Sequence, residues 1–141
     1  MAIKQISVFL ENKPGMLDKM TKVLADAGIT LRALSLAETK DFGIVRMIVD
    51  DVYETATLLK DHDYIASRTP VVAVMIPDVG GGLNKVLTAL TAADVNLEYM
   101  YSTLAGGQSG QAYMILRVED TKKAEEALRA AGFRLIEEFP D

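Results

Sequence analysis

The sequence predicts an α+β protein built from two ferredoxin-like βαββαβ units in tandem. The first observation is an internal repeat, because a shift of 66 residues places Leu17 on Leu83 and Leu31 on Leu97. The second is that both halves alternate strand-type and helix-type hydrophobic periodicity in the same order, with a glycine-containing loop before the first helix. We therefore expect two domains, each with an antiparallel sheet and with both helices on one face of it.

The first domain is expected over residues 1–69. Met16 to Ala27 carries apolar residues at helical spacing, and Gly28 stands where a glycine would end that helix. A second helix is expected from Val52, because Asp51 followed by Glu54 resembles a capping box. Strands are predicted over Ile3–Leu10, Ile29–Ala37, Ile44–Val49 and Tyr64–Arg68.

The second domain is expected over residues 70–141, with Pro70 as the boundary. A helical stripe runs from Leu83 to Ala93, and a second helix begins near Asp120 and Thr121 and ends at Gly132. The turn Ala105–Gly110 is about three residues longer than its counterpart, Thr39–Gly43. Strands are predicted over Val71–Ile76, Val95–Ser102, Ala112–Val118 and Phe133–Phe139.

Composition limits the classes of function. The formal charge of −5 and the isoelectric point of about 4.9 argue against a nucleic-acid partner and an anionic membrane surface. The absence of cysteine excludes disulfides and thiolate chemistry. No apolar run approaches 18 residues and the N-terminus lacks a signal-peptide core, so we expect a cytoplasmic protein. Because domains of about 70 residues bury too little surface to be robust alone, we expect association between the two halves or between chains. Apolar residues on the second face of the predicted sheets leave surface to cover, so we expect at least a homodimer.

Two glycine loops carry the strongest functional signal. Pro14-Gly15 joins the first predicted strand to the first helix, and Gly80-Gly81-Gly82 occupies the corresponding place in the second half. Backbone N–H groups at a helix start have no intrahelical acceptor, and they suit a carboxylate or another anion. The alternative is that both loops are plain strand-to-helix turns that need glycine only for their geometry.

These residues carry a family resemblance. Glu11–Leu17 followed by Ala27–Leu31 resembles the opening of an ACT domain, in which a D/N-K/R-P-G-x-L turn leads into the first helix. The second half repeats the pattern with Pro77-Asp78, Gly80–Leu83 and Asp94–Leu97, so nearly the whole chain is similar to stand-alone tandem ACT proteins. It departs from the family at Val79-Gly80, where Lys/Arg-Pro is usual, and at Thr30, where Asn is frequent.

The resemblance implies a regulatory module that binds a free amino acid between two ACT domains and acts on a metabolic enzyme or a regulator. The ligand carboxylate would bind loop N–H groups and its ammonium Asp78, Asn12 or Asn96. Gly15 and Gly81 are expected to be the most exacting positions, because a Cβ would obstruct the turn and the ligand. The implied ligand-binding residues are Asn12, Lys13, Pro14, Gly15, Met16, Leu17, Thr30, Asp78, Gly80, Gly81, Gly82, Leu83 and Asn96.

Other functions have weaker support in the sequence. A ligand-free scaffold for protein interaction or oligomerisation remains the alternative, with the loops as simple turns. An acylphosphatase-like enzyme would require an arginine in the first loop, where Lys13 is the only cation, so we expect no catalysis. RNA could stack on Tyr99, Tyr101 and Tyr113, but the acidic balance argues against it. We expect no cofactor and no metal site, and the sequence leaves the identity of the amino acid open.

Overall fold

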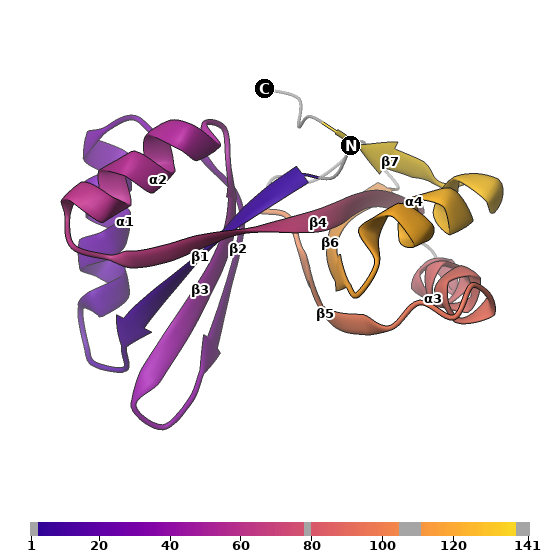
Figure 1. Ribbon diagram of the computed structural model, residues 1–141, viewed down its shortest axis with the longest axis horizontal. Helices are drawn as coiled ribbons and strands as arrows, with labels where there is room; N and C mark the ends of the chain where they lie inside the picture. Colours follow the sequence, from indigo (N-terminus) through magenta and orange to yellow (C-terminus); the bar gives the residue numbers. More distant parts are fainter. Residues whose placement is uncertain (1–2, 78–79, 105–110, 138–141) are drawn as a thin grey trace. The chain divides into compact units, whose positions relative to one another are not determined.

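The computed structural model describes residues 3–77, 80–104 and 111–137, which form two compact units (Figure 1). One unit is Lys4–Thr69, and the other comprises Ile3 and the described residues from Pro70 onward. The elements are β1 (Ile3–Glu11), α1 (Met16–Asp26), β2 (Leu31–Glu38), β3 (Phe42–Val49), α2 (Val52–Asp61), β4 (Ile65–Pro77), α3 (Gly82–Ala92), β5 (Leu97–Ser102), β6 (Gln111–Val118), α4 (Thr121–Ala130) and β7 (Arg134–Ile136).

The unit Lys4–Thr69 has the strand order β2-β3-β1-β4, and β3 pairs antiparallel with both β1 and β2. Val8 faces Val45 across β1 and β3, and Leu34 faces Met47 across β2 and β3. Helices α1 and α2 cover one face of the sheet (Figure 1). Strand alternation sends every second side chain beneath these helices. The buried core consists of Ile6, Val8, Leu10, Met20, Leu24, Val45, Met47, Val49 and Leu59.

The second unit repeats this arrangement with the order β5-β6-β4, and β7 pairs with the other edge of β4. Val74 lies opposite Met114 on β6 and Leu135 on β7. Its buried core consists of Val72, Val74, Ile76, Val86, Leu90, Val95, Leu116, Val118, Ala124 and Leu128. The predicted fold class, two ferredoxin-like units with antiparallel sheets, is therefore confirmed.

Fine details of the backbone repeat as well. The register of β2 shifts between Leu31 and Ala33, and the register of β5 shifts between Leu97 and Tyr99, which again lies 66 residues further on. Such a bulge increases the local twist of a strand. Because these shifts depend on backbone geometry rather than on particular side chains, they support a true structural duplication.

The helix starts fall into two kinds. Asp51 and Asp120 cap α2 and α4, and their side chains accept hydrogen bonds from the backbone N–H groups of Glu54 and Lys123. Helices α1 and α3 begin after a glycine in the left-handed region, and neither has a side-chain cap. In α1 the N–H of Met16 donates to the carbonyl of Lys13 at 3.4 Å, so it is the N–H groups of Leu17 and Asp18 that are left to water or to a ligand among the described residues.

Each of the helices α1 to α4 ends in a Schellman motif. In α1, Gly28 has a φ of 74°, and the N–H groups of Gly28 and Ile29 donate to the carbonyls of Ala25 and Leu24. Gly132 serves α4 in the same way, as the sequence predicted. The motifs of α2 and α3 place Asp63 and Asp94 at positive φ, which the sequence did not indicate.

The prediction of two separate strands meeting at Pro70 was wrong. Residues 65–77 form the single strand β4, and Pro70 lies inside it. The ladders to β6 and β7 begin only at Val72 and Ala73, so the missing N–H of Pro70 removes no bond from these two ladders. The Pro70 carbonyl accepts a hydrogen bond of 2.9 Å from Arg117 Nη1.

Other predicted bounds move by a few residues. Strands β2 and β5 begin about two residues later than expected, because Thr30 and Asn96 still belong to the turns after the helices. Strand β3 begins earlier, at Phe42, and β7 ends at Ile136, so Phe133 and Glu137 are not part of it. The predicted turn 105–110 lies outside the described residues. Within the described part of the chain, no helix is both long and apolar enough to cross a membrane.

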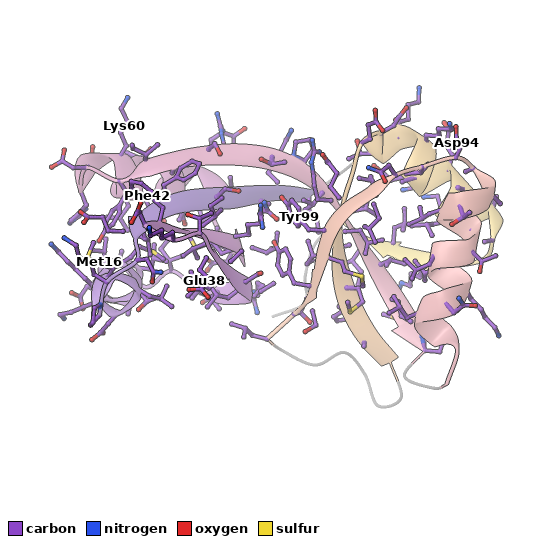
Figure 2. The ribbon with its side chains drawn as sticks, turned by 90° about the horizontal axis from the view of Figure 1, so that it is seen from below. Met16, Glu38, Phe42, Lys60, Asp94 and Tyr99 are labelled. Carbon is purple, nitrogen blue, oxygen red and sulfur yellow. The ribbon has the colours of Figure 1, made fainter. Side chains whose placement is uncertain are left out.

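Asp94→Gly is expected to stabilise the protein by roughly 0.5–1 kcal/mol, because Asp94 (labelled in Figure 2) has a φ of 57° that costs a side-chain-bearing residue energy. Urea unfolding measures the change. The control is Ala92→Gly, which replaces a residue with helical geometry and should destabilise α3 by a similar amount. If both substitutions lower the free energy of unfolding, the positive φ of Asp94 does not cost the protein stability.

Candidate ligand-binding site

A cavity of about 230 Å³ opens beside the first glycine loop, entirely within the unit Lys4–Thr69. The end of β1, the start of α1 and the β2–β3 hairpin contribute its walls. Figure 2 labels Met16 on α1 and Glu38 on β2, which stand on two of these walls. The lining residues are Leu10, Glu11, Asn12, Lys13, Met16, Leu17, Leu36, Glu38 and Gly43.

The inner surface of the cavity is apolar. Leu10 is buried, and Met16 and Leu17 pack partly against the core of the unit. Leu36 points to the same side of the sheet as Leu34 but remains 54% exposed, because it lies where the helices no longer cover β2. Gly43 keeps the wall thin, since a Cβ there would lie 3.2 Å from Leu36 Cδ1.

The rim of the cavity is polar and charged. Lys13 Nζ lies 2.7 Å from Glu11 Oε2, and this hydrogen bond, together with the charge of the carboxylate, raises the pKa of Lys13. Because both side chains are exposed, the pair contributes little to stability. In this ion pair the positive charge of Lys13 and the negative charge of Glu11 cancel. The net charge of the lining residues is therefore the single negative charge of the Glu38 carboxylate.

Asn12 ties the glycine loop to the β2–β3 hairpin. Its backbone N–H donates to the carbonyl of Asp41 at 3.0 Å. Its side-chain Nδ2 lies 3.4 Å from Glu38 Oε2 and 3.4 Å from the carbonyl of Thr39. These contacts hold two walls of the cavity together, so Asn12 has a structural role in the site.

The structure brings together only part of the predicted site. Asn12, Lys13, Met16 and Leu17 line the cavity, whereas Pro14 and Gly15 form the turn beside it. The sequence analysis missed Leu10, Glu11, Leu36, Glu38 and Gly43. The hairpin residues could have been found from strand register, because Gly43 pairs with both Leu10 and Glu38.

Thr30 and Asn96 lie far from the glycine loop of their own repeat. The backbone carbonyl of Thr30, just before β2, accepts a hydrogen bond from the N–H of Asp50, which follows the last residue of β3. Asn12 instead contacts Asp41, at the opposite end of β3, just before that strand begins. A strand of that length spans roughly 20 Å or more. Asn96 accepts from the N–H of Glu119 at the corresponding end of β6. Thr30 or Asn96 could therefore lie beside a glycine loop only if that loop belonged to a different ACT-like domain.

The second glycine loop differs from the first. Asp78, a predicted ligand residue, lies outside the described residues, and Gly80 and Leu83 are exposed at the start of α3. A Cβ on Gly15 or Gly81 would meet no atom within 4 Å, so these glycines are needed for their φ of 83° and 86° rather than for space. Gly82 is the crowded position, because a Cβ there would lie 2.3 Å from the Pro77 carbonyl oxygen.

Among the described residues, no group of three or more histidine, aspartate or glutamate side chains is arranged to hold a metal ion. His62 is exposed at the end of α2, and its Nδ1 lies 2.9 Å from the carbonyl of Leu58. The chemistry that the site offers is therefore that of a small cavity with an apolar interior, charged groups on its rim and an uncapped helix start beside it.

Two βαββαβ units with a glycine loop before the first helix of each define a tandem ferredoxin-like fold. The chain belongs to the ACT domain pair family, whose sequence profile matches residues 1–139. ACT domains are regulatory modules, and the family assigned from the sequence is thereby confirmed. A comparison with curated proteins finds no match.

Several solved structures have a similar fold. The protein BT0572 from Bacteroides thetaiotaomicron is 41% identical with a TM-score of 0.90, over 96% of this chain and 92% of that chain. The ligand-free regulatory subunit of aspartate kinase from Thermus thermophilus is 19% identical with a TM-score of 0.69, over 93% of both chains. The regulatory subunit of aspartate kinase from Thermus flavus is 18% identical with a TM-score of 0.65, over 94% of both. The two kinase subunits share the fold of this chain.

Gly82→Ala is expected to destabilise the second unit by about 1–3 kcal/mol, because the new methyl group would overlap the Pro77 carbonyl oxygen. Gly81→Ala should cost about 1 kcal/mol, since it adds only the strain of a left-handed residue. Chemical denaturation of both variants measures the difference. A smaller loss for Gly82→Ala than for Gly81→Ala would show that the close approach to Pro77 does not constrain the loop.

Proposed function

We propose that this ACT domain pair binds a free α-amino acid and changes the activity of a metabolic enzyme or a regulator in response. The observation that carries the proposal is the cavity beside an uncapped helix start. First-turn N–H groups of α1 suit the ligand carboxylate, and the carboxylate of Glu38 suits its ammonium. A volume of about 230 Å³ fits a ligand smaller than those of typical drug-sized pockets, which occupy roughly 300–1,000 Å³.

We place the ligand at an interface between ACT domains. The first glycine loop would supply the cavity, and the strand start of another ACT domain would supply Asn96 or Thr30. Support comes from the exposure of the side chains of Thr30, Asn96 and Leu36. Because the other domain can belong to a second copy of the chain, the proposal includes a homodimer.

A scaffold without a ligand is the second candidate. Phe9 and Phe42 are 47% and 54% exposed, and both belong to the set of alternating positions on the sheet face that α1 and α2 leave uncovered. Exposed aromatic side chains on one face are typical of a protein interaction surface. This alternative predicts association that does not depend on any amino acid.

A thermal-shift screen with each of the twenty amino acids tests the proposed function. A ligand that binds only the folded protein stabilises it, by about 2.7 kcal/mol at 100 times its dissociation constant, and so raises the unfolding temperature. We expect one amino acid or a few of similar chemistry to produce such a rise. If none does so at millimolar concentration, the scaffold alternative takes its place.

Asn12→Ala and Asn96→Ala test the position of the site by calorimetry with the amino acid found in the screen. Asn12→Ala should weaken binding because it releases the loop from the hairpin, and Asn96→Ala should weaken it by about 1–3 kcal/mol if its amide bonds the charged ligand. Asn84→Ala, an exposed position on α3, is the control. An effect of Asn12 alone would confine the site to one domain, and equal binding by all variants would place it elsewhere.

A further inference from the structure

The two repeats have different residue types at most of the positions that line the cavity in the first repeat. Strand register fixes the correspondence, because Leu36 pairs with Val45 as Ser102 pairs with Met114. Two apolar positions keep their chemistry, with Ile76 for Leu10 and Leu83 for Leu17. The other positions change from Glu11 to Pro77, Asn12 to Asp78, Lys13 to Val79, Met16 to Gly82, Leu36 to Ser102, Glu38 to Leu104 and Gly43 to Ala112.

The backbone explains the most informative of these changes. Met16 directly follows the left-handed Gly15 and forms a wall of the first cavity. Gly82 holds the same place after Gly81, and the direction of its missing Cβ points at the Pro77 carbonyl oxygen. In the second repeat the backbone at Pro77 therefore leaves no room at position 82 for a side chain such as that of Met16.

Charge distinguishes the repeats as well. The first cavity has Glu38 on its rim, and the ion pair between Lys13 and Glu11 leaves the charge of Glu38 uncompensated. Leu104 stands in place of Glu38 and is 61% exposed, so the second repeat has no carboxylate on this strand position, and its acidic residue among the matched positions is Asp78, in place of Asn12 on the glycine loop. The apolar inner surface of the first cavity, made by Leu10, Met16 and Leu36, would receive an aliphatic side chain rather than a charged one.

We infer that each chain binds a single amino acid, in the cavity of the first repeat, and that this ligand has an aliphatic or thioether side chain. Glu38 receives its ammonium, the first turn of α1 receives its carboxylate, and Leu36 and Met16 contact its side chain. The second repeat has lost the site and retains the fold. This inference rests on the proposed function, and it adds the stoichiometry, the ligand class and the role of Glu38.

Isothermal titration calorimetry of the full chain tests the stoichiometry and the ligand class. Leucine, isoleucine, valine and methionine are titrated, with aspartate and lysine as charged comparisons. We expect one ligand per chain and at least about tenfold tighter binding of the best aliphatic amino acid, since a charged side chain would lose its hydration in the apolar cavity.

Variants that exchange residues between the repeats test the location. Glu38→Gln and Glu38→Leu should weaken binding by about tenfold to a hundredfold, the effect of a lost hydrogen bond to a charged group. Leu104→Glu, the reverse exchange at the matched position, should leave both affinity and stoichiometry unchanged. Glu38 and Leu104 are exposed, and the unfolding temperature of each variant without ligand verifies that its fold is intact.

Each other outcome overturns a stated part of the inference. Any stoichiometry other than one per chain, or an equal loss of affinity in Leu104→Glu and Glu38→Gln, contradicts the single site while leaving the proposed function in place. Tighter binding of aspartate or lysine than of every aliphatic amino acid contradicts the ligand class. If none of the twenty amino acids binds, both the inference and the proposed function fail.

Discussion

The burial of one sheet face beneath two helices is the constraint on which the rest of each unit depends. In the unit Lys4–Thr69, Val8, Val45 and Leu24 belong to one buried cluster, to which sheet and helix both contribute. A unit of this size has little other apolar surface to bury, so both helices must return directly onto the sheet. The chain therefore has only a few residues, from Asn12 to Gly15, in which to turn from β1 into α1.

That short turn leads directly to the candidate site. Gly15 adopts a left-handed conformation, which reverses the chain but brings no side chain to cap α1. The helices that do not follow a glycine loop have aspartate caps at Asp51 and Asp120. The uncapped N–H groups thus result from the way the strand meets the helix, and a ligand carboxylate would complete the hydrogen bonds that the chain leaves open.

Local signals in the sequence predicted most of the fold. Periodicity placed the start of α1 at Met16, and the capping pattern placed the start of α2 after Asp51, because these features depend on neighbouring residues. The single strand through Pro70 could not be predicted, since proline ordinarily interrupts a ladder and only the register shows that the ladders to β6 and β7 begin after it. The positive φ of Asp94 could not be predicted either, because aspartate after a helix does not indicate a left-handed residue as strongly as glycine does.

The candidate site was harder to predict because three of its nine lining residues come from the β2–β3 hairpin. Glu38 and Gly43 are more than twenty residues from the glycine loop, and they reach it only through the pairing of β1 with β3 and of β3 with β2. A motif read along the chain finds the loop residues Asn12 and Lys13, which are local, but not the residues brought to them by strand pairing.

The comparison of the repeats shows which features the fold constrains. Left-handed residues at 15 and 81, shifted registers near 31 and 97 and aspartate caps at 51 and 120 are shared, because each is needed to place helices on the sheet. The positions that differ, such as Leu36 and Ser102, lie outside the common core and are not required for that packing. The fold therefore constrains the backbone of both units but not the side chains at these positions, so the two units can differ in the ligand chemistry that they offer.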